Sequence, residues 1–289
     1  MFSIFPIVTF SLLLSPLSGL YVEIINNDPT STWVAVEYPP SIMSIEKAKR
    51  RLGSIVDDDE PFEPYVEPND VPDEFDGREE WKGMLPPVID QGDCNSCYAL
   101  ATAESTGTRF AIKGCNHGTL SAQDLVSCDK TDNGCSGGSP SRAMIWVRDH
   151  GITTEQCLPY VSGTGRVPSC PSRCMNGSTV TRYQGTRAIG IPASIIQKHL
   201  IENGPVYAHM VVYGDFTEYR SGVYQHKEGA SFGGHAVLLV GWGIEEGTPY
   251  WLCQNTWGPN FGENGFFKII RGKNECDFEK KFYAVTVDC

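Results

Sequence analysis

Residues 88–100 read VIDQGDCNSCYAL and place two cysteines, Cys94 and Cys97, three positions apart. From Ser96 onward the apolar residues recur on one face, which predicts a helix that starts there with Ser96 as its N-cap. Cys97 would then lie in the first helical turn, where free N–H groups and the helix dipole favour a thiolate. The pair is compatible with a redox couple, half of a zinc site, a structural disulfide, or a nucleophile beside a structural cysteine.

The surroundings of the pair disfavour redox and zinc chemistry. A thioredoxin-like Cys-x-x-Cys needs a βαβ unit with a parallel sheet, but the β-rich segments of this chain are distant in sequence and of antiparallel character. A zinc site needs four closely spaced ligands, and the other short pairs, Cys170 with Cys174 and Cys128 with Cys135, are loosely spaced. A nucleophilic cysteine explains the pattern best if the chain supplies a histidine partner.

The charge of the chain is unevenly distributed. The 289 residues carry a net charge of −12, which argues against a nucleic-acid partner. Residues 21–70 hold 11 acidic and 4 basic side chains, or −7, and residues 1–20 hold none, which leaves −12 + 7 = −5 for residues 71–289. The acids and prolines after residue 56 indicate a linker that a protease could reach.

The first 20 residues predict a secretory signal peptide, cleaved near Ser18–Leu20. A membrane anchor is the alternative, but the apolar run is short and is interrupted by prolines, so no stable membrane insertion is expected. Residues 21–70 then form a detachable propeptide, with a strand at Thr32–Val36 and a helix at Ser44–Leu52. A secretory route permits disulfides, and an odd count of 11 cysteines leaves at least one outside intrachain pairs.

Residues 71–289 divide into two halves, which indicates an α+β fold with a site in the cleft between them. About 71–190 is mostly helical and about 191–289 mostly β. Helices are predicted from Ser96 and at Ser121–Ser127, Ser139–His150 and Ile195–Asn203. Strands are predicted at Val206–Val212, Gly222–Tyr224, Ala236–Trp242, Tyr250–Asn255, Gly265–Ile270 and Tyr283–Val287.

One of the 6 histidines stands out as a partner for Cys97. His235 opens the apolar strand AVLLVGW, and Asn255 ends the strand YWLCQN, so adjacent strands could bring the two side chains together. Trp257 could then shield their hydrogen bond from water. The other histidines lie in polar or turn surroundings, typical of the surface.

Four stretches of the chain resemble the papain-like cysteine peptidases: QGDCNSCYA, CSGGSP, GGHAVLLVGWG and QNTWGPNFGENGFFKIIRG. His235 follows Cys97 by 235 − 97 = 138 residues and Asn255 by 255 − 97 = 158, close to the spacing of that family. Within the family the chain is most similar to cathepsin B, in a short protozoan-type form. The resemblance covers residues 71–289 and implies a two-domain papain-like fold, with a helical left domain and a β-barrel-like right domain.

The resemblance also implies roles for individual residues. Cys97 is the nucleophile, His235 its general base and acid, and Asn255 the group that orients His235. Gln91 and the Cys97 N–H form the oxyanion hole, and the Cys97 thiolate pairs with a His235 imidazolium. Gly137, Gly138 and Trp257 border the substrate. The implied disulfides are Cys94–Cys135, Cys128–Cys170 and Cys157–Cys174. A bond between Cys115 and Cys289 is one possibility that the resemblance does not decide. Cys276 is unassigned, and Cys253 is expected to be a buried thiol.

The chain departs from the family pattern at Asn95, which replaces a glycine, and at Tyr98, Thr256 and Phe261. It also lacks the histidine-bearing insertion with which cathepsin B blocks its cleft, because only LPYVSGTGRVPS separates Cys157 from Cys170. We therefore expect an open cleft and endopeptidase activity. A peptidase homologue that binds peptides but cleaves them weakly is the alternative.

Lys281 falls where cathepsin B has an acidic residue in its specificity pocket, so a charged pocket that disfavours arginine is one interpretation and a solvated lysine the other. The expected partners are protein or peptide substrates and the chain's own propeptide as inhibitor. We expect no cofactor and no metal, and a monomer in a lysosome-like vacuole or outside the cell. Asn176 begins a glycosylation sequon.

Overall fold

The computed structural model describes residues 19–56 and 65–289. Most of the predicted signal peptide and the acidic run at 57–60 lie outside the described residues. The helices are α1 Leu20–Asn27, α2 Ile45–Lys49, α3 Gly77–Glu80, α4 Cys97–Ile112, α5 Ala122–Cys128, α6 Pro140–His150 and α7 Ile196–Asn203. The strands are β1 Trp33–Ala35, β2 Phe75–Asp76, β3 Arg187–Ile191, β4 Val206–Tyr213, β5 Tyr219–Tyr224, β6 Ser231–Glu245, β7 Thr248–Gln254, β8 Phe266–Ile270 and β9 Phe282–Thr286.

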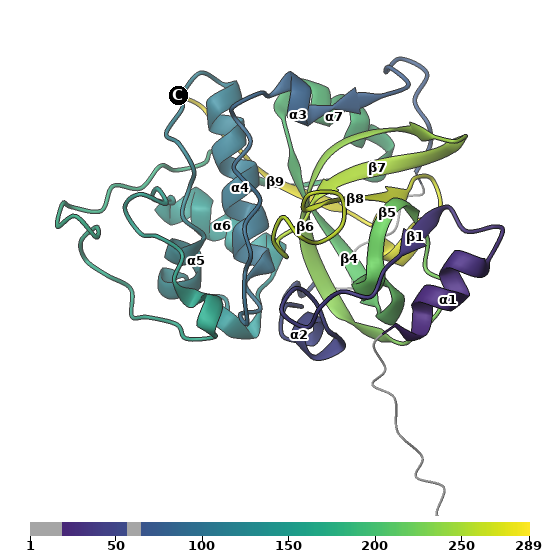
Figure 1. The fold of residues 1–289 in the computed structure, drawn as a ribbon. Coiled ribbons are helices and arrows are strands. Elements are labelled where there is room, and N and C mark those ends of the chain that lie inside the picture. The colour runs from purple at the N-terminus through teal and green to yellow at the C-terminus, as the bar shows by residue number, and fades with distance from the viewer. Residues whose placement is uncertain (1–18, 57–64) are drawn as a thin grey trace, which may run out of the picture.

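The helices α4, α5 and α6 form one side of the molecule, and most of the strands form the other (Figure 1). The helix α4 runs through the middle of the helical side with almost every side chain buried. Local sequence explains the starts of the two helices beside it: the Ser121 hydroxyl accepts from the Asp124 N–H at the start of α5, and Pro140 occupies the first turn of α6. The predicted α+β, two-domain arrangement is confirmed.

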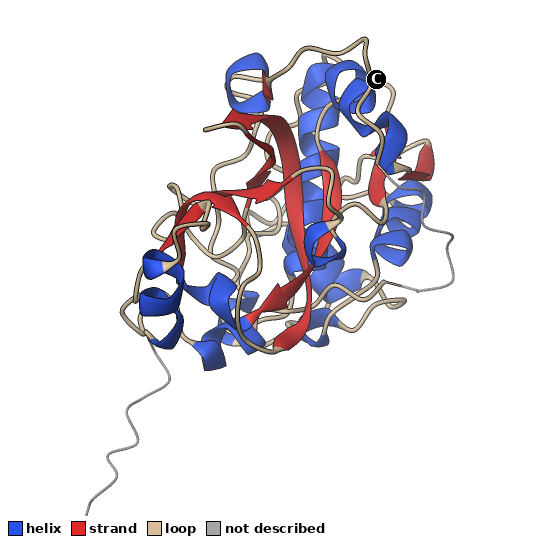
Figure 2. Ribbon diagram, turned by 90° about the vertical axis from the view of Figure 1, so that its right-hand side faces the viewer, coloured by secondary structure: helices blue, strands red, loops and turns tan. Residues whose placement is uncertain are grey.

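The strands form one twisted sheet in the order β1-β5-β8-β7-β6-β4-β9-β3, with β2 added beside β6. Neighbours are antiparallel except β5 and β8. The long strand β6 lies between β7 and β4 and also pairs with β2. Figure 2, turned by 90° from Figure 1, shows strands in red with helices in blue on both sides of them. The central residues of β6 are buried because both faces are covered, which explains the continuous apolar run AVLLVGW.

All the predicted strands of the second half are present, with bounds that differ by up to a few residues. The strand β6 starts at Ser231, so His235 lies within the strand rather than at its mouth. Two strands were missed. The strand β3 reads RAIGI, and its glycine and half-exposed positions gave no clear alternation; β2 is only two residues long.

The N-terminal segment, residues 19–56, packs against the sheet and then enters the middle of the molecule. Its strand β1 pairs antiparallel with β5, and Trp33 is buried there against Tyr224 at a centroid distance of 5.1 Å. The helix α2 begins at Ser44, whose hydroxyl accepts from the Lys47 N–H as predicted, and it lies where the helical and sheet sides meet (Figure 1). The chain that follows α2 therefore reaches the boundary between the two sides.

Disulfides fasten the helical side. The structure joins Cys94 to Cys135, Cys128 to Cys170 and Cys157 to Cys174, the same pairs that the resemblance implies. A further bond joins Cys115, just after α4, to the C-terminal Cys289. Such a bond across 174 residues restricts the unfolded chain strongly. Cys97, Cys253 and Cys276 are free and buried.

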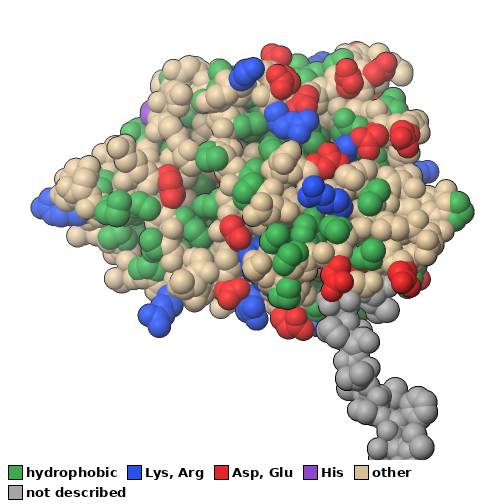
Figure 3. Space-filling model, in the orientation of Figure 1, with side chains coloured by type: hydrophobic (Ala, Val, Ile, Leu, Met, Phe, Trp, Pro, Cys, Tyr) green, Lys and Arg blue, Asp and Glu red, His purple; other side chains and the backbone are tan. Residues whose placement is uncertain are grey.

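Acidic and basic side chains alternate over the face of the molecule shown in Figure 3, and no broad field of one sign covers it. Within residues 19–56 and 65–289, no helix has the length and apolar character needed to cross a membrane.

Candidate active site

Cys97 is the first residue of α4 and is fully buried. The Cys97 sulfur faces β6. The N–H of Ala236, the residue after His235, interacts with this sulfur and lowers the pKa of the thiol. The predicted side-chain cap is wrong: the Ser96 hydroxyl hydrogen-bonds the Tyr160 hydroxyl at 2.6 Å instead of a helix N–H. The N–H groups of the first turn of α4 thus remain available to a negative charge near Cys97.

Gln91 is held beside Cys97 from both sides of the molecule. Its Nε2 donates to the Cys94 carbonyl at 2.7 Å, and its Oε1 accepts from the Thr256 hydroxyl at 2.6 Å. The Cys94–Cys135 bond fixes the loop on the helical side. These contacts fix the orientation of the Gln91 amide, which is the requirement for a donor in an oxyanion hole.

His235 and Asn255 come together from neighbouring strands. His235 lies in β6 and Asn255 follows β7, and Nε2 of His235 donates to Oδ1 of Asn255 at 2.8 Å. Because that oxygen can only accept, the hydrogen lies on Nε2 and Nδ1 of a neutral ring is left as an acceptor. Nδ1 has no hydrogen-bond partner within the described part of the chain. The Trp257 ring lies 4.8 Å from the His235 ring, centroid to centroid, and covers this pair.

The buried site favours the neutral forms of both reacting groups. Burial raises the pKa of the Cys97 thiol to about 11, and the N–H groups of Ala236 and Gly53 offset this only in part. Burial also lowers the pKa of the His235 imidazole to about 4, against the hydrogen bond to Asn255. The thiolate–imidazolium pair that the resemblance implies is therefore not the stable form while the N-terminal segment covers the site.

Residues 53–55 of the N-terminal segment pair with the walls of the cleft through their backbone. The Gly138 N–H donates to the Gly53 carbonyl at 2.8 Å, and the Ile55 N–H donates to the Gly138 carbonyl at 2.9 Å. On the other wall, the Ser54 N–H donates to the Gly234 carbonyl at 3.1 Å. The pairing of Ser54 with Gly138 is parallel. A Cβ at the neighbouring Gly137 would lie 2.9 Å from the Gly53 carbonyl oxygen, and one at Gly234 would lie 2.2 Å from the Ser54 carbonyl oxygen, so this close backbone approach requires glycine on both walls.

Gly53 is the point of closest approach to the residues around Cys97. A Cβ built at Gly53 would lie 1.9 Å from the Asn95 carbonyl oxygen and 2.8 Å from the Asn95 Cβ. Asn95 itself does not have the left-handed backbone that would demand glycine. The substitution at position 95 therefore leaves the loop unstrained. The nearest atom to Gly53 is the backbone oxygen of residue 95, so the requirement for glycine at position 53 does not depend on the asparagine side chain.

Arg51 of the N-terminal segment contacts the side-chain amide of Gln91. Its backbone carbonyl accepts from Gln91 Nε2 at 3.0 Å, so a carbonyl oxygen already occupies the candidate oxyanion donor. Its side chain is fully buried, and its guanidinium forms an ion pair with Asp90 at 2.7 Å. Sequence reasoning missed Arg51 because nothing in its local pattern distinguishes it from the other basic residues of the predicted helix at Ser44–Leu52.

A cavity of about 430 Å³ lies where Ser54 enters the cleft, and Lys281 contributes to its lining. The Ser54 hydroxyl hydrogen-bonds Nδ1 of His209 at 2.8 Å and the Tyr207 hydroxyl at 2.6 Å. The Lys281 side chain is half-buried and runs over Gly190, so it also borders a second cavity of about 240 Å³. His209 was expected at the surface, but its place beside Ser54 shows that only the fold reveals it as a pocket residue.

The expectation that the other histidines lie at the surface is met only in part. His150 is exposed, whereas the remaining three are half-buried, two of them against aromatic rings: His117, His199 and His226. None of them lies at the cleft described above. The remaining substitutions keep the site intact, because Tyr98 is buried against Gly138 and Phe261 packs on Trp257 at 4.9 Å, centroid to centroid.

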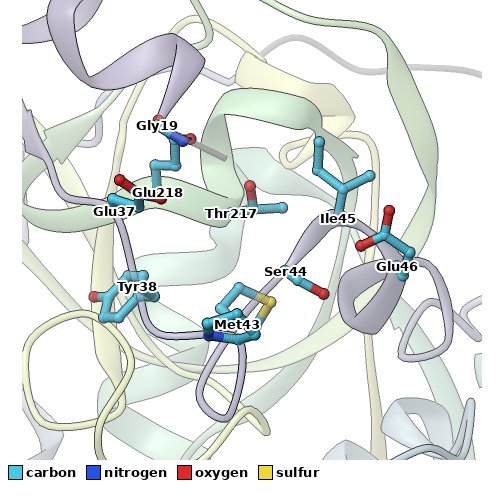
Figure 4. A pocket seen from close by; sticks show the side chains of 10 residues that line it. Gly19, Glu37, Tyr38, Met43, Ser44, Ile45, Glu46, Thr217 and Glu218 are labelled. Atoms are coloured by element: carbon cyan, nitrogen blue, oxygen red, sulfur yellow. Dashed lines mark hydrogen bonds between the residues drawn. The ribbon is translucent and has the colours of Figure 1, made fainter. Parts of the chain in front are cut away.

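A further cavity, of about 310 Å³, lies away from Cys97 (Figure 4). It is enclosed between the N-terminal segment, which contributes Glu37, Tyr38 and Met43, and the turn at Thr217 and Glu218. Its walls exist only while the N-terminal segment is docked. Its lining includes neither cysteine nor histidine, so it is not the site described above.

Comparison with known proteins identifies the class of molecule to which this arrangement belongs. The model of the papain family cysteine protease matches residues 71–286. The chain therefore belongs to the papain family of cysteine proteases. It is similar to Cathepsin B-like CP3 of Giardia intestinalis, with 42% identity over 75% of each chain, and to Cathepsin B-like cysteine proteinase 4 of Caenorhabditis elegans, with 36% identity over 88% of each chain.

A solved structure resembles the whole described arrangement. That of proCathepsin B S9 from Trypanosoma congolense covers 94% of this chain and 99% of its own, with 30% identity and a TM-score of 0.85. Its relatives and this structural match place the chain in the cathepsin B-like group of the family. The matched structure is a proform.

We predict that Gly53→Ala will expel the N-terminal segment from the cleft, because the added Cβ would overlap the Asn95 carbonyl. In the full chain, the rate at which iodoacetamide labels Cys97 should rise at least about tenfold, since a backbone clash of this kind costs more than the 1.4 kcal/mol that a tenfold change requires. Ile55→Ala, at an exposed side chain of the same stretch, is the matched control and should change the rate little. Equal rates for Gly53→Ala and wild type would contradict the docking.

We also predict a steep pH profile for Cys97 labelling in the full chain. With its pKa raised to about 11, the thiol is neutral at every pH below that value, so the labelling rate should grow about tenfold per pH unit between about pH 6 and pH 9. Once the N-terminal segment is removed, water returns, and labelling should be faster and less dependent on pH. Mass spectrometry of the Cys97 peptide separates this signal from Cys253 and Cys276. Rapid, pH-independent labelling of the full chain would refute the neutral pair.

Proposed function

We propose that the protein is a cysteine endopeptidase, made as a secretory proenzyme and working in a lysosome-like vacuole or outside the cell. The observation that carries this proposal is the convergence of Cys97, Gln91 and the His235–Asn255 pair in one buried site. These are a nucleophile, an oxyanion donor and an oriented base, the set that acyl transfer requires.

The chemistry follows from the positions of these groups. The Cys97 sulfur attacks the carbonyl carbon of the substrate, and Nδ1 of His235 takes up the thiol proton. Gln91 Nε2 and the Cys97 N–H stabilise the oxyanion. His235 then gives its proton to the leaving amine, which yields a thioester, and the ring next activates a water that hydrolyses it. Asn255 keeps the His235 ring in the orientation needed for both proton transfers.

We further propose that residues 21–70 are an inhibitory propeptide. Three observations support this. Residues 53–55 pair with both walls of the cleft, and the Arg51 carbonyl accepts the hydrogen bond of Gln91 Nε2. Burial also favours the neutral forms of Cys97 and His235. The parallel pairing with Gly138 supports a chain direction opposite to that of a substrate. Release of this segment by a cut near Val71 would restore solvent and allow the thiolate to form.

An endopeptidase needs a cleft that is open at both ends. The loop at residues 158–169 contains only the short turn Ser162–Thr164 and no histidine that could hold a substrate carboxylate. The alternative, a homologue that binds peptides but cleaves weakly, would require obstruction at Asn95. That residue lies beside Gly53 and replaces none of the catalytic groups, so the endopeptidase is favoured.

The decisive experiment is acid activation of the secreted full chain, followed by labelling with a thiol-reactive epoxide. We expect a new N-terminus near Val71, labelling that is lost in Cys97→Ala and kept in Cys253→Ala, and internal cleavage of a long polypeptide substrate. Cys253→Ala is the matched control because Cys253 is also a free buried thiol. Labelling without hydrolysis would favour the weak homologue, and release of C-terminal dipeptides as the main product would refute the endopeptidase mode.

We predict that Lys281 lowers the preference for arginine at the second residue before the cut, because it borders the cavity entered by Ser54. Lys281→Glu should shift the ratio of kcat/KM for arginine over glutamate at that position by about tenfold or more, given the strength of close charge pairs. Profiling with a peptide library measures the ratio, and Lys198→Glu, an exposed lysine on α7, is the control for net charge. An undiminished preference for arginine in the wild type would show that Lys281 is merely solvated.

A further inference from the structure

The Arg51 guanidinium identifies a polar site at the cleft that the catalytic groups do not account for. Its side chain has no exposed surface, and one amino group lies 2.7 Å from Asp90 Oδ1. The other donates to the Trp257 carbonyl at 3.4 Å. Within the described residues, Nε and the amino group that faces Asp90 form no aligned hydrogen bond, so the contact with Asp90 is an ion pair. Burial lowers the pKa of this guanidinium, and Asp90 counteracts the shift. A buried guanidinium needs such a partner to be tolerated at all.

The enzyme itself orients the Asp90 carboxylate before any guanidinium arrives. The Gly92 N–H donates to Asp90 Oδ1 at 2.9 Å, and the Asp90 backbone pairs with Trp257. A Cβ at Gly258 would lie 3.3 Å from the Asp90 side chain, so the neighbouring loop stays close to it. A second acid, Asp93, pairs with Arg50 at 3.2 Å in a more exposed position. The acid site is therefore part of residues 71–289, and the N-terminal segment is its occupant.

The direction of the chain decides which end of a substrate would reach Asp90. In the N-terminal segment, Ser54 pairs with Gly138 and Arg51 lies at Gln91, so the path from Gly138 to the oxyanion donor runs against the sequence. A substrate that runs the other way places its acyl part at Gly138 and its scissile carbonyl at Gln91. The residues after the cut then continue toward Trp257 and Asp90.

We propose that Asp90 forms a subsite for a cationic side chain, arginine above all, on the leaving-group side of the scissile bond. This inference rests on the proposed peptidase activity and extends it to a substrate class. The cavity at the Ser54 end is lined by Lys280, Lys281 and Asp277, and Lys280 pairs with Asp277 at 3.0 Å, so that end differs from the Asp90 end in carrying more basic than acidic groups. Favoured substrates have an acidic or neutral residue before the cut and an arginine at the first or second residue after it.

The N-terminal segment places an arginine at Asp90 because it runs through the cleft in the direction opposite to that of a substrate. Its sequence reads Arg50–Arg51 first and then, after Val56, the acids that begin at Asp57. Val56 lines the cavity of Lys280 and Lys281, and Arg51 lies at Asp90. The same sequence placed in the substrate direction would bring its arginines toward the lysines. The charges therefore favour the reversed, uncleaved orientation.

The first test measures the contact without using hydrolysis. In the full chain, Arg51→Gln and Asp90→Asn should each speed iodoacetamide labelling of Cys97 by about tenfold, the effect expected when a close charge pair with one buried partner is broken. The double variant should be no faster than either single variant, because both changes remove the same pair. Additive effects, or no effect of Asp90→Asn, would overturn the subsite. This readout needs only a reactive thiol, so it stands even if the chain hydrolyses no peptide.

The second test compares substrates that differ only in arginine or citrulline, its neutral isostere, at the first or second residue after the cut. The acid-processed enzyme should cleave the arginine peptide with about tenfold higher kcat/KM. Asp90→Asn should reduce that ratio to nearly one, and Asp149→Asn, an exposed acid on α6, should keep it. The ratio is taken within each variant, so a general loss of activity cancels. Equal rates for the two peptides at both positions would refute the proposal, whereas no cleavage of any peptide would refute the proposed function instead.

Discussion

The burial of Cys97 and His235 under the backbone of residues 53–55 is the constraint on which the rest of the structure depends. A backbone strand can lie this close only if the walls carry no side chains, and the residues that face the strand on the two walls are Gly137 and Gly234. The same requirement applies to the inserted strand at Gly53. Three glycines from distant parts of the sequence thus define one narrow slot, and Cys97 and His235 are buried beneath it.

Burial has opposite consequences for packing and for reactivity. Excluding water strengthens the hydrogen bond between His235 and Asn255 and fixes the histidine ring. It also makes a thiolate and an imidazolium costly, so both groups become neutral. The hydrogen bond between His235 and Asn255 is therefore already formed while the N-terminal segment covers the site, and the same cover disfavours the charged forms of Cys97 and His235.

Much of this arrangement could be predicted from the sequence because it depends on local patterns. The helix after Ser96, the strands around His235 and Asn255, and the spacing of the motifs all leave signals within short windows. Arg51 and His209 could not be predicted in this way, since their positions depend on where a segment from the other end of the chain crosses the cleft. Ser96 shows the limit even locally, because a tertiary contact with Tyr160 outcompetes its capping role.

The N-terminal segment has to resemble a substrate closely enough to bind and differ from it enough to survive. It places a carbonyl at Gln91, as a substrate would, yet its pairing with Gly138 is parallel. Backbone hydrogen bonds alone do not determine which residue of the reversed N-terminal segment lies opposite Gly138, because an extended strand can slip by one residue along its partner. Gly53 against Asn95 removes that freedom by size, and Arg51 against Asp90 removes it by charge. One steric and one electrostatic contact, two residues apart in the same short segment, are sufficient to fix both register and direction.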